Sequence, residues 1–307
     1  MKSEKHHSGN CMELPEWFTE YKMALSQIDS AGFSESWNQS YDTLFGELEW
    51  SDDDVNSIVK QRKIEFDSLN EKQKKAYEQI LKCKCAGINL DTPIYHYATF
   101  SYLNEAIKRG GFLLSQPKEW SVNWEDTAFK NLQKNAKLTD TEELVNVYLK
   151  NSYGMCWTLN GDNENILEME KRKHPGESIV IIASTVRRLL RAYITDNISI
   201  RACSMAKIEY LPRRDLKEKN VSPNDLQFGD AGTDVHHYSI SRTIDKYQAQ
   251  DEVRLIFEDC QECCDKTLIT IVNKVSGREE IKLIKHIDLR MVITSIRVAE
   301  NDYLFKC

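Results

Sequence analysis

The first part of the chain, from Leu14 to about Cys85, carries apolar side chains at helical spacing. Ser51 precedes three aspartates, and a serine cap followed by acidic residues is favourable at the positive end of a helix dipole. Apolar residues then recur from 55 to 81, mostly at steps of three, four or seven residues, with Lys and Glu between them. We therefore predict one long amphipathic helix there, and two shorter helices upstream, around 17–25 and 37–48.

The pattern changes at the segment 85–93 (CAGINLDTP), whose Gly, Asn, Asp and Pro residues interrupt regular structure. Beyond it, short runs rich in β-branched and aromatic residues predict strands. These runs are 94–99, 112–115, 152–159, 177–184, 202–211, 251–259, 266–273, 281–289 and 290–299. Helical patterns lie between some of them, at 101–111, 142–150, 165–171 and 186–193, and we expect Ser101 to cap the first of these helices.

This order of elements favours an α+β fold over a doubly wound parallel sheet, because the strands are many and the helices few and irregularly placed. The sequence predicts two parts, a helical N-terminal arm at 1–92 and an α+β domain at 93–307. It contains neither a G-x-G-x-x-G motif nor a Walker loop. Rossmann-type dinucleotide binding and P-loop hydrolysis are therefore unsupported.

Composition narrows the class of protein. A hydrophobic content of 41% in 307 residues supports a sizeable core, and the net charge is −7 with Lys and Arg scattered among Asp and Glu. That distribution disfavours general binding to nucleic acid. No run approaches the roughly 20 apolar residues needed to span a bilayer, and the first ten residues lack the apolar centre of a signal peptide. We expect a cytoplasmic protein that does not enter a membrane.

The nine cysteines are an odd number in a chain too large to need disulfide staples, so reduced thiols are expected. The run 260–264 (CQECC) resembles half of a zinc site. Its other half would have to be the cysteines at 83 and 85 or the histidines at 236 and 237, and neither pair has a suitable spacing. We expect no metal, and cysteines in a solvent-facing turn are the simpler interpretation.

Three polar clusters are candidates for chemistry, and the first lies on the strand expected at 94–99. His96 stands between two tyrosines, Tyr95 and Tyr97, and Thr99 ends the run. A histidine in this setting is able to bind a ligand, although core and edge histidines are common on strands. The order of strand, helix, Gly-Gly and strand that follows favours the ligand interpretation.

The second cluster ends the strand expected at 152–159. Thr158 is placed to hydrogen-bond a ligand and Trp157 to stack on it. The alternative is that Trp157 is a core aromatic and Cys156 a small buried hydrophobic residue. Cys156 lacks histidine and acid partners in a recognisable arrangement, which argues against a thiol nucleophile.

The third cluster is the run 250–257 (QDEVRLIF). Alternation with a period of two places Gln250, Glu252 and Arg254 on one face of a strand and apolar side chains on the other. This polar face is either part of a site or a solvated face with a cross-strand ion pair.

From Tyr95 onward, the chain resembles the bacterial domain of unknown function 2971 family over about two-thirds of its length. The resemblance follows, in order, the aromatic and histidine-containing strand, a short helix, FLLSQPKEW, the Cys-Trp-Thr strand, GESIVIIAS, a strand ending at Tyr210, and Lys246 ahead of Gln-Asp-Glu-Val-Arg. The same layout is similar to ADP-ribosyltransferases. That similarity implies a mixed, mostly antiparallel split β-sheet and NAD as a substrate, with no metal.

The similarity also implies roles for individual residues. Glu252 would stabilise the oxocarbenium-like ribose formed when the nicotinamide bond breaks, as carboxylates do in glycoside hydrolysis. Gln250 would orient the acceptor, and His96 would hold the adenosine-side ribose or phosphate. Tyr97 or Trp157 would stack on the nicotinamide and Thr158 would fix its orientation, while Thr99 and Arg254 complete the expected cofactor-binding set.

The function predicted from these motifs is NAD-dependent ADP-ribosyl transfer to a macromolecular target, in a bacterial toxin or an antiphage defence effector. One alternative is a non-catalytic module that binds a nucleotide or a protein within a defence or toxin-antitoxin system. The other is an interaction protein whose helical arm docks a protein partner, which predicts exposed apolar residues on the arm.

Overall fold

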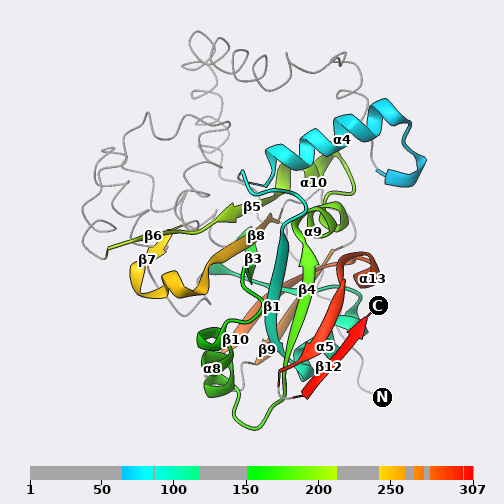
Figure 1. Ribbon diagram of the computed structural model, residues 1–307. Coiled ribbons are helices and arrows are strands. Elements are labelled where there is room, and N and C mark those ends of the chain that lie inside the picture. The colour runs from blue at the N-terminus through cyan, green and yellow to red at the C-terminus, as the bar shows by residue number, and fades with distance from the viewer. Residues whose placement is uncertain are drawn as a thin grey trace, which may run out of the picture. The chain divides into compact units, whose positions relative to one another are not determined.

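A mostly antiparallel open sheet with helices on its faces organises the protein (Figure 1). The structure is a computed structural model, and it describes residues 64–85, 87–117, 151–212, 242–259, 266–272, 277–299 and 301–306. The chain divides into two compact units, 1–50 and 51–307, and all the described residues belong to the second. The helices expected at 17–25, 37–48 and 142–150 lie outside the described residues.

The main sheet has the strand order β12-β11-β4-β1-β3-β2-β10-β9, with β8 paired to β3 and β5 paired to β8. The strands are β1 Pro93–Thr99, β2 Leu113–Ser115, β3 Ser152–Thr158, β4 Ile179–Thr185, β5 Cys203–Lys207, β8 Glu252–Glu258, β9 Lys266–Val272, β10 Glu279–Lys285, β11 Ser295–Val298 and β12 Asn301–Lys306. Their pairings are all antiparallel. A separate parallel ribbon joins β6 Glu209–Leu211 to β7 Arg242–Ile244. The α+β class expected from the sequence is confirmed.

The sheet is weakly joined in its middle. β1 pairs with all seven residues of β4 but meets β3 at a single pair, Tyr95 with Thr158. β3 in turn pairs with β8 along its whole length. The backbone ladder is therefore nearly interrupted between β1 and β3.

The helices of the described regions are α4 Glu71–Cys83, α5 Phe100–Arg109, α8 Glu164–Lys173, α9 Val186–Tyr193, α10 Asn197–Ala202 and α13 Leu289–Val292, with 3-10 helices η1 Phe66–Ser68 and η4 Asp245–Gln250. Thr99, not Ser101, caps α5, because its hydroxyl oxygen accepts from the Tyr102 N–H at 3.1 Å. Gly110 ends that helix with φ of 71°, in the left-handed region that glycine adopts without strain.

The prediction of one continuous helix over 55–81 is wrong, because the chain is not α-helical from 64 to 70. Residues 64–70 contain only the short η1, and α4 starts afresh at Glu71. Asn70 explains the break, since its side chain accepts from the Gln73 N–H while the Gln73 side chain accepts from the Asn70 N–H. In a continuous helix, these two N–H groups would bond to carbonyls of the preceding turn. In the capping box they bond to side chains instead, which favours the start of a new helix at this position. The first part of the expected helix lies outside the described residues.

The last expected strand also needs correction. Residues 289–292 form α13, capped by the Asp288 side chain, and only Ser295–Val298 form a strand, β11. The short acceptor side chain of Asp288 favours a helix start over a continuing strand. Similarly, the run expected at 202–211 divides into β5 and β6.

Helices cover both faces of the central strands. On one face, Tyr97 packs with Ile179 and Ile181, and Leu167 of α8 lies against them. On the other face, Tyr193 of α9 approaches the ring of Phe257, with centroids 6.2 Å apart. The central strands are consequently buried from both sides, which explains why β8 reads as a nearly continuous buried run.

Candidate functional site

Thr158 and Glu252 face each other at the ends of two paired strands. They are direct cross-strand partners in the β3–β8 ladder, so their side chains lie on the same face of the sheet. The Thr158 hydroxyl donates to the Gln250 carbonyl oxygen at 2.6 Å, and the Leu159 N–H donates to the Asp251 carbonyl oxygen at 3.0 Å. These bonds tie the end of β3 to the turn that leads into β8. We call Thr158, Gln250, Glu252, Arg254 and Tyr210 the Glu252 cluster.

The centre of the Glu252 cluster is a buried ion pair. Arg254 Nε donates to Glu252 Oε1 at 2.7 Å, and Arg254 Nη2 donates to Glu252 Oε2 at 3.3 Å. The two side chains are only 8% and 5% exposed, for Glu252 and Arg254 respectively. The alternation predicted for the strand is thus confirmed for this pair, which shares one face, while Val253 points to the other and is fully buried.

Tyr210 joins this cluster from β6. Its hydroxyl oxygen accepts from the Glu252 N–H at 2.7 Å, and burial is the main reason that the pKa of the phenol is raised. The phenol therefore stays protonated near neutral pH and keeps an O–H to donate. Tyr210 ends one of the strands in the motif series described above, but no role was predicted for it, because its local sequence pattern does not show that it reaches β8.

Gln250 departs from the expected arrangement. It ends η4 rather than lying on β8, so the strand alternation does not extend to it. Asp251, between them, has φ of 43°, a left-handed value that is uncommon outside glycine. The Gln250 side chain is directed to α8, where Nε2 lies 3.6 Å from the sulfur of Met169.

Tyr97 lies on the same face of the sheet as the Glu252 cluster, because Tyr95, two residues away on β1, pairs with Thr158. The Tyr97 hydroxyl donates to the Gly161 carbonyl oxygen at 2.7 Å and accepts from the Asn163 N–H at 2.8 Å. Burial raises its pKa. Tyr97 thus positions the 159–163 loop and does not present a free hydroxyl.

Asn163 is a residue of this region that the sequence analysis did not select. Its Oδ1 accepts from the Ile166 N–H at 3.2 Å and caps α8, while its Nδ2 donates to the Ala249 carbonyl oxygen at 2.6 Å. It therefore links the start of α8 to η4. The signal available in the sequence was an Asn directly before a helical pattern, which predicts a cap but not a long-range contact.

His96 and Trp157 lie on the opposite face from the Glu252 cluster. His96 neighbours Tyr97 along β1, and Trp157 neighbours Thr158 along β3, so alternation turns both side chains away. Their ring centroids are 5.5 Å apart, and Trp157 is 2% exposed with Phe112 against its edge. Trp157 is a core aromatic, the alternative considered for it above.

The contacts of His96 explain why a histidine stands at this position. Its Nδ1 lies 2.8 Å from the Cys156 carbonyl oxygen, at the point where the β1–β3 ladder is interrupted. A carbonyl only accepts, so Nδ1 carries the proton. Burial is the main reason that the pKa of His96 is lowered. The neutral imidazole thus donates a hydrogen bond from β1 to a carbonyl of β3, beside the single backbone pair that joins the two strands.

Thr99 is remote from the Glu252 cluster. It lies four residues beyond Tyr95, about 13 Å along an extended strand, and its hydroxyl caps α5. The structure therefore brings together the side chains of Thr158, Glu252 and Arg254, with Tyr97 on the same face, and it brings only the main chain of Gln250 to them. It does not bring His96, Trp157 or Thr99 to them.

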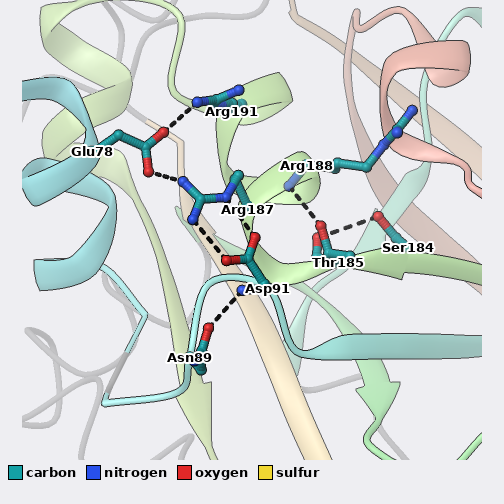
Figure 2. Close-up of polar contacts among 8 residues, drawn as sticks. All are labelled: Glu78, Asn89, Asp91, Ser184, Thr185, Arg187, Arg188 and Arg191. Carbon is teal, nitrogen blue, oxygen red and sulfur yellow. Dashed lines mark hydrogen bonds and ion pairs between the residues drawn. The ribbon is translucent and has the colours of Figure 1, made fainter. Parts of the chain in front are cut away.

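A second group of charged side chains lies where α4 meets α9 (Figure 2). Glu78 forms ion pairs with Arg187 and Arg191, and Arg187 also reaches Asp91, with Nε 2.8 Å from Oδ1. The Arg191 guanidinium stacks over Phe66, 3.7 Å from the ring centroid. Burial lowers the pKa of both arginines, and for Arg187 the charge of Arg191 adds to this effect. These charges compensate one another and join α4 to the sheet domain.

The apolar side of α4 is buried as well. Ala76, Tyr77, Ile80 and Leu81 are each less than a tenth exposed, and the Tyr77 hydroxyl donates to the Ile194 carbonyl oxygen at 2.6 Å. This described part of the predicted arm is therefore packed, rather than presenting an apolar face to a partner. The domain boundary at 92/93 stays a prediction.

The described residues show neither a metal-binding group nor a membrane-spanning helix. Among these residues, no group of three or more His, Cys, Asp and Glu side chains is arranged to hold a metal ion. The cysteine run 260–264 lies outside them. None of the described helices has both the length and the apolar character of a membrane-spanning helix.

Comparison with known proteins found no matching family model, no matching curated protein and no matching solved structure. The resemblance to the domain of unknown function 2971 family accordingly stays a prediction from the motifs. The Glu252 cluster alone carries the argument for chemistry. Its components are a carboxylate paired with a guanidinium, two hydroxyls and the Gln250 carbonyl oxygen, groups able to orient a polar substrate through hydrogen bonds and charge.

Proposed function

We propose that the domain transfers ADP-ribose from NAD to a macromolecular acceptor, with Glu252 as its essential carboxylate. The observation that supports this is that Thr158 of β3 and Glu252 of β8 lie opposite each other on one face of the sheet, with the Gln250 carbonyl oxygen bonded to the Thr158 hydroxyl. The proposal differs in one respect from the sequence-based assignment. NAD lies on the face of Glu252, and His96, Trp157 and Thr99 support the fold instead of contacting it.

In the proposed reaction, Glu252 stabilises the developing charge, and Arg254 and Gln250 orient the reacting groups. When the bond between the ribose and nicotinamide breaks, the leaving nicotinamide takes the bonding electron pair and the ribose becomes oxocarbenium-like. The Glu252 carboxylate stabilises that positive charge. Arg254 holds both carboxylate oxygens in a fixed direction. Gln250 orients the acceptor, which forms the new bond to the ribose carbon and loses its proton to water.

Nicotinamide release from NAD by the full-length protein tests the proposal. Glu252→Gln keeps the shape of the side chain and removes its charge, so the rate is expected to fall about 100-fold or more. Glu258→Gln is the matched control, because Glu258 lies on the same face at the other end of β8. If Glu252→Gln releases nicotinamide at an unchanged rate, the assignment is overturned. It is also overturned if the wild-type protein releases no nicotinamide from NAD when a lysate supplies the acceptor.

One specific feature favours a second function: Arg254 binds both oxygens of the Glu252 carboxylate, and the pair is buried. A carboxylate paired in this way is also a structural ion pair. In that case the domain is a non-catalytic module that binds a nucleotide or a protein. Calorimetric titration with NAD separates the two functions, because binding without nicotinamide release supports the module and binding with release supports the transferase.

The macromolecular acceptor and the toxin or defence role belong to the same proposal. Incubating a bacterial lysate with the protein and a tagged NAD is expected to label a discrete protein or nucleic acid, and Glu252→Gln is expected to abolish the label. Expression in a bacterial host is expected to slow growth for the wild type and not for this variant. Equal growth of the two strains contradicts the toxin role.

A further inference from the structure

The strand β9 forms one end of the main sheet. It pairs with β10 through seven consecutive residue pairs with no bulge. Along its outer edge it has no strand partner among the described residues. Edge strands are usually protected by charges, proline or a bulge, because their open N–H and C=O groups recruit other strands. In β9 the sole charged residue is Lys266, at the first position, where it is ion-paired to Asp259.

The side chains of this edge are unusually apolar for an exposed hairpin. Leu268 is 49% exposed and Val272 is 62% exposed, and Ile281 of β10 is 39% exposed. Thr270 pairs with Ile281, so these side chains lie on one face of the hairpin. Large exposed apolar side chains gathered on one face are typical of an interaction surface.

The residue order along the β9 edge favours a second copy of the same chain as the partner. The run 268–272 reads Leu-Ile-Thr-Ile-Val, which is nearly the same in both directions. We propose that a second copy of this chain adds its own β9 in antiparallel orientation, with a two-fold axis at Thr270. Leu268 then faces Val272 of the second copy, Ile269 faces Ile271, and Thr270 faces Thr270.

This register suits both the side chains and the symmetry. β-branched pairs and Thr–Thr pairs are favourable directly across an antiparallel ladder. No charge faces a like charge within 268–272. Residues directly opposite share a face, so the exposed ridge of Leu268, Val272 and Ile281 continues into the same ridge of the second copy. The Leu268–Val272 and Ile269–Ile271 contacts each occur twice and the Thr270 pair lies once on the axis, as a closed two-fold interface requires.

A charge exchange at the axis tests the dimer in the full chain, with sedimentation velocity as the measurement. The wild type is expected to shift from monomer to dimer as its concentration rises. Thr270→Lys and Thr270→Glu each place like charges opposite one another, and each is expected to weaken the dimer about tenfold or more. A one-to-one mixture of the two variants is expected to restore it, because opposite charges then meet.

Thr267→Lys is the matched control. It adds the same charge to an exposed threonine of the same strand, three residues from the axis, where no second lysine faces it. It is expected to dimerise like the wild type. A wild type that stays monomeric, a dimer that persists in Thr270→Lys, or a mixture that remains monomeric each overturns the proposal. Circular dichroism establishes that every variant is folded, and rescue in the mixture does not depend on that comparison.

Discussion

Glu252 and Arg254 form a bidentate ion pair two residues apart on one strand, with less than a tenth of either side chain exposed. Removing water from two charges is costly, and the pair is tolerated because each group compensates the other. Losing one partner leaves an uncompensated charge in the same buried place. The pair is therefore expected to matter for stability whether or not Glu252 also contacts a substrate.

The first prediction concerns this coupling. Arg254→Met, which keeps the length of the side chain and removes its charge, is expected to lower the free energy of unfolding by about 3 kcal/mol. The double variant with Glu252→Gln is expected to lose less than the sum of the two single variants, since it leaves no orphaned charge. Urea denaturation measures all four proteins of the cycle. Strict additivity would show that the two side chains do not interact.

The second prediction concerns the left-handed residue before Glu252. Asp251 has φ of 43° and is exposed, so its side chain strains the backbone without filling any core space. Asp251→Gly is expected to raise the free energy of unfolding by about 0.5 to 1 kcal/mol, because glycine adopts this conformation freely. Asp251→Val is expected to lower it, since a β-branched residue is disfavoured there. If glycine destabilises the protein, Asp251 makes a contact that outweighs its strain.

The third prediction concerns two glycines, one required by lack of space for a side chain and the other favoured by backbone conformation. A Cβ on Gly111 would lie 2.2 Å from the Lys285 carbonyl oxygen, a backbone atom of β10 and not the end of a flexible side chain. Gly111→Ala is expected to cost about 2 to 3 kcal/mol through overpacking. Gly87 is the control, because it has φ of 75° and open space around it. Gly87→Ala is expected to cost only about 1 kcal/mol, from backbone conformation alone. Equal losses in thermal unfolding would contradict the steric explanation.

Local sequence patterns were sufficient to place some residues of the site and not others. The β8 alternation correctly placed Glu252 and Arg254 on one face, because side-chain direction in a strand follows from local geometry. Gln250 was misplaced, since the change from η4 to β8 occurs through a strained residue that resembles ordinary strand sequence. The cap of α5 was placed two residues late because Thr99 serves both the strand and the helix.

The faces of His96 and Trp157 were not predictable in the same way. Alternation along β1 and along β3 was readable, but the relation between the two strands depends on the register of a single pair, Tyr95 with Thr158. Nothing in the sequence fixes a register between strands that lie so far apart in the chain. The convergence of Asn163 and Tyr210 on the turn before β8 depends on the same long-range packing.

The last prediction concerns pH. The pKa of His96 lies below its ordinary value of 6.5, mainly because burial disfavours the charged imidazole. In the unfolded chain the same group takes up a proton at its ordinary pKa, so between these two values the unfolded state binds more protons than the folded state. The free energy of unfolding therefore contains a contribution that is complete above about pH 6.5 and is lost as the pH falls toward the lower, folded pKa.

His96→Asn removes this contribution while keeping a donor for the Cys156 carbonyl, which the histidine Nδ1 reaches at 2.8 Å. Urea denaturation at a series of pH values from about 7.5 to 5 is expected to show a steeper loss of stability for the wild type than for the variant, with a difference of at most about 1.4 kcal/mol per pH unit for one proton. The variant is expected to be the less stable protein at pH 7.5, because asparagine fills less of the space beside Trp157 and Tyr102. Parallel curves for the two proteins would show that His96 titrates alike in the folded and unfolded states. In that case the imidazole does not act as a buried neutral donor across the interrupted β1–β3 ladder.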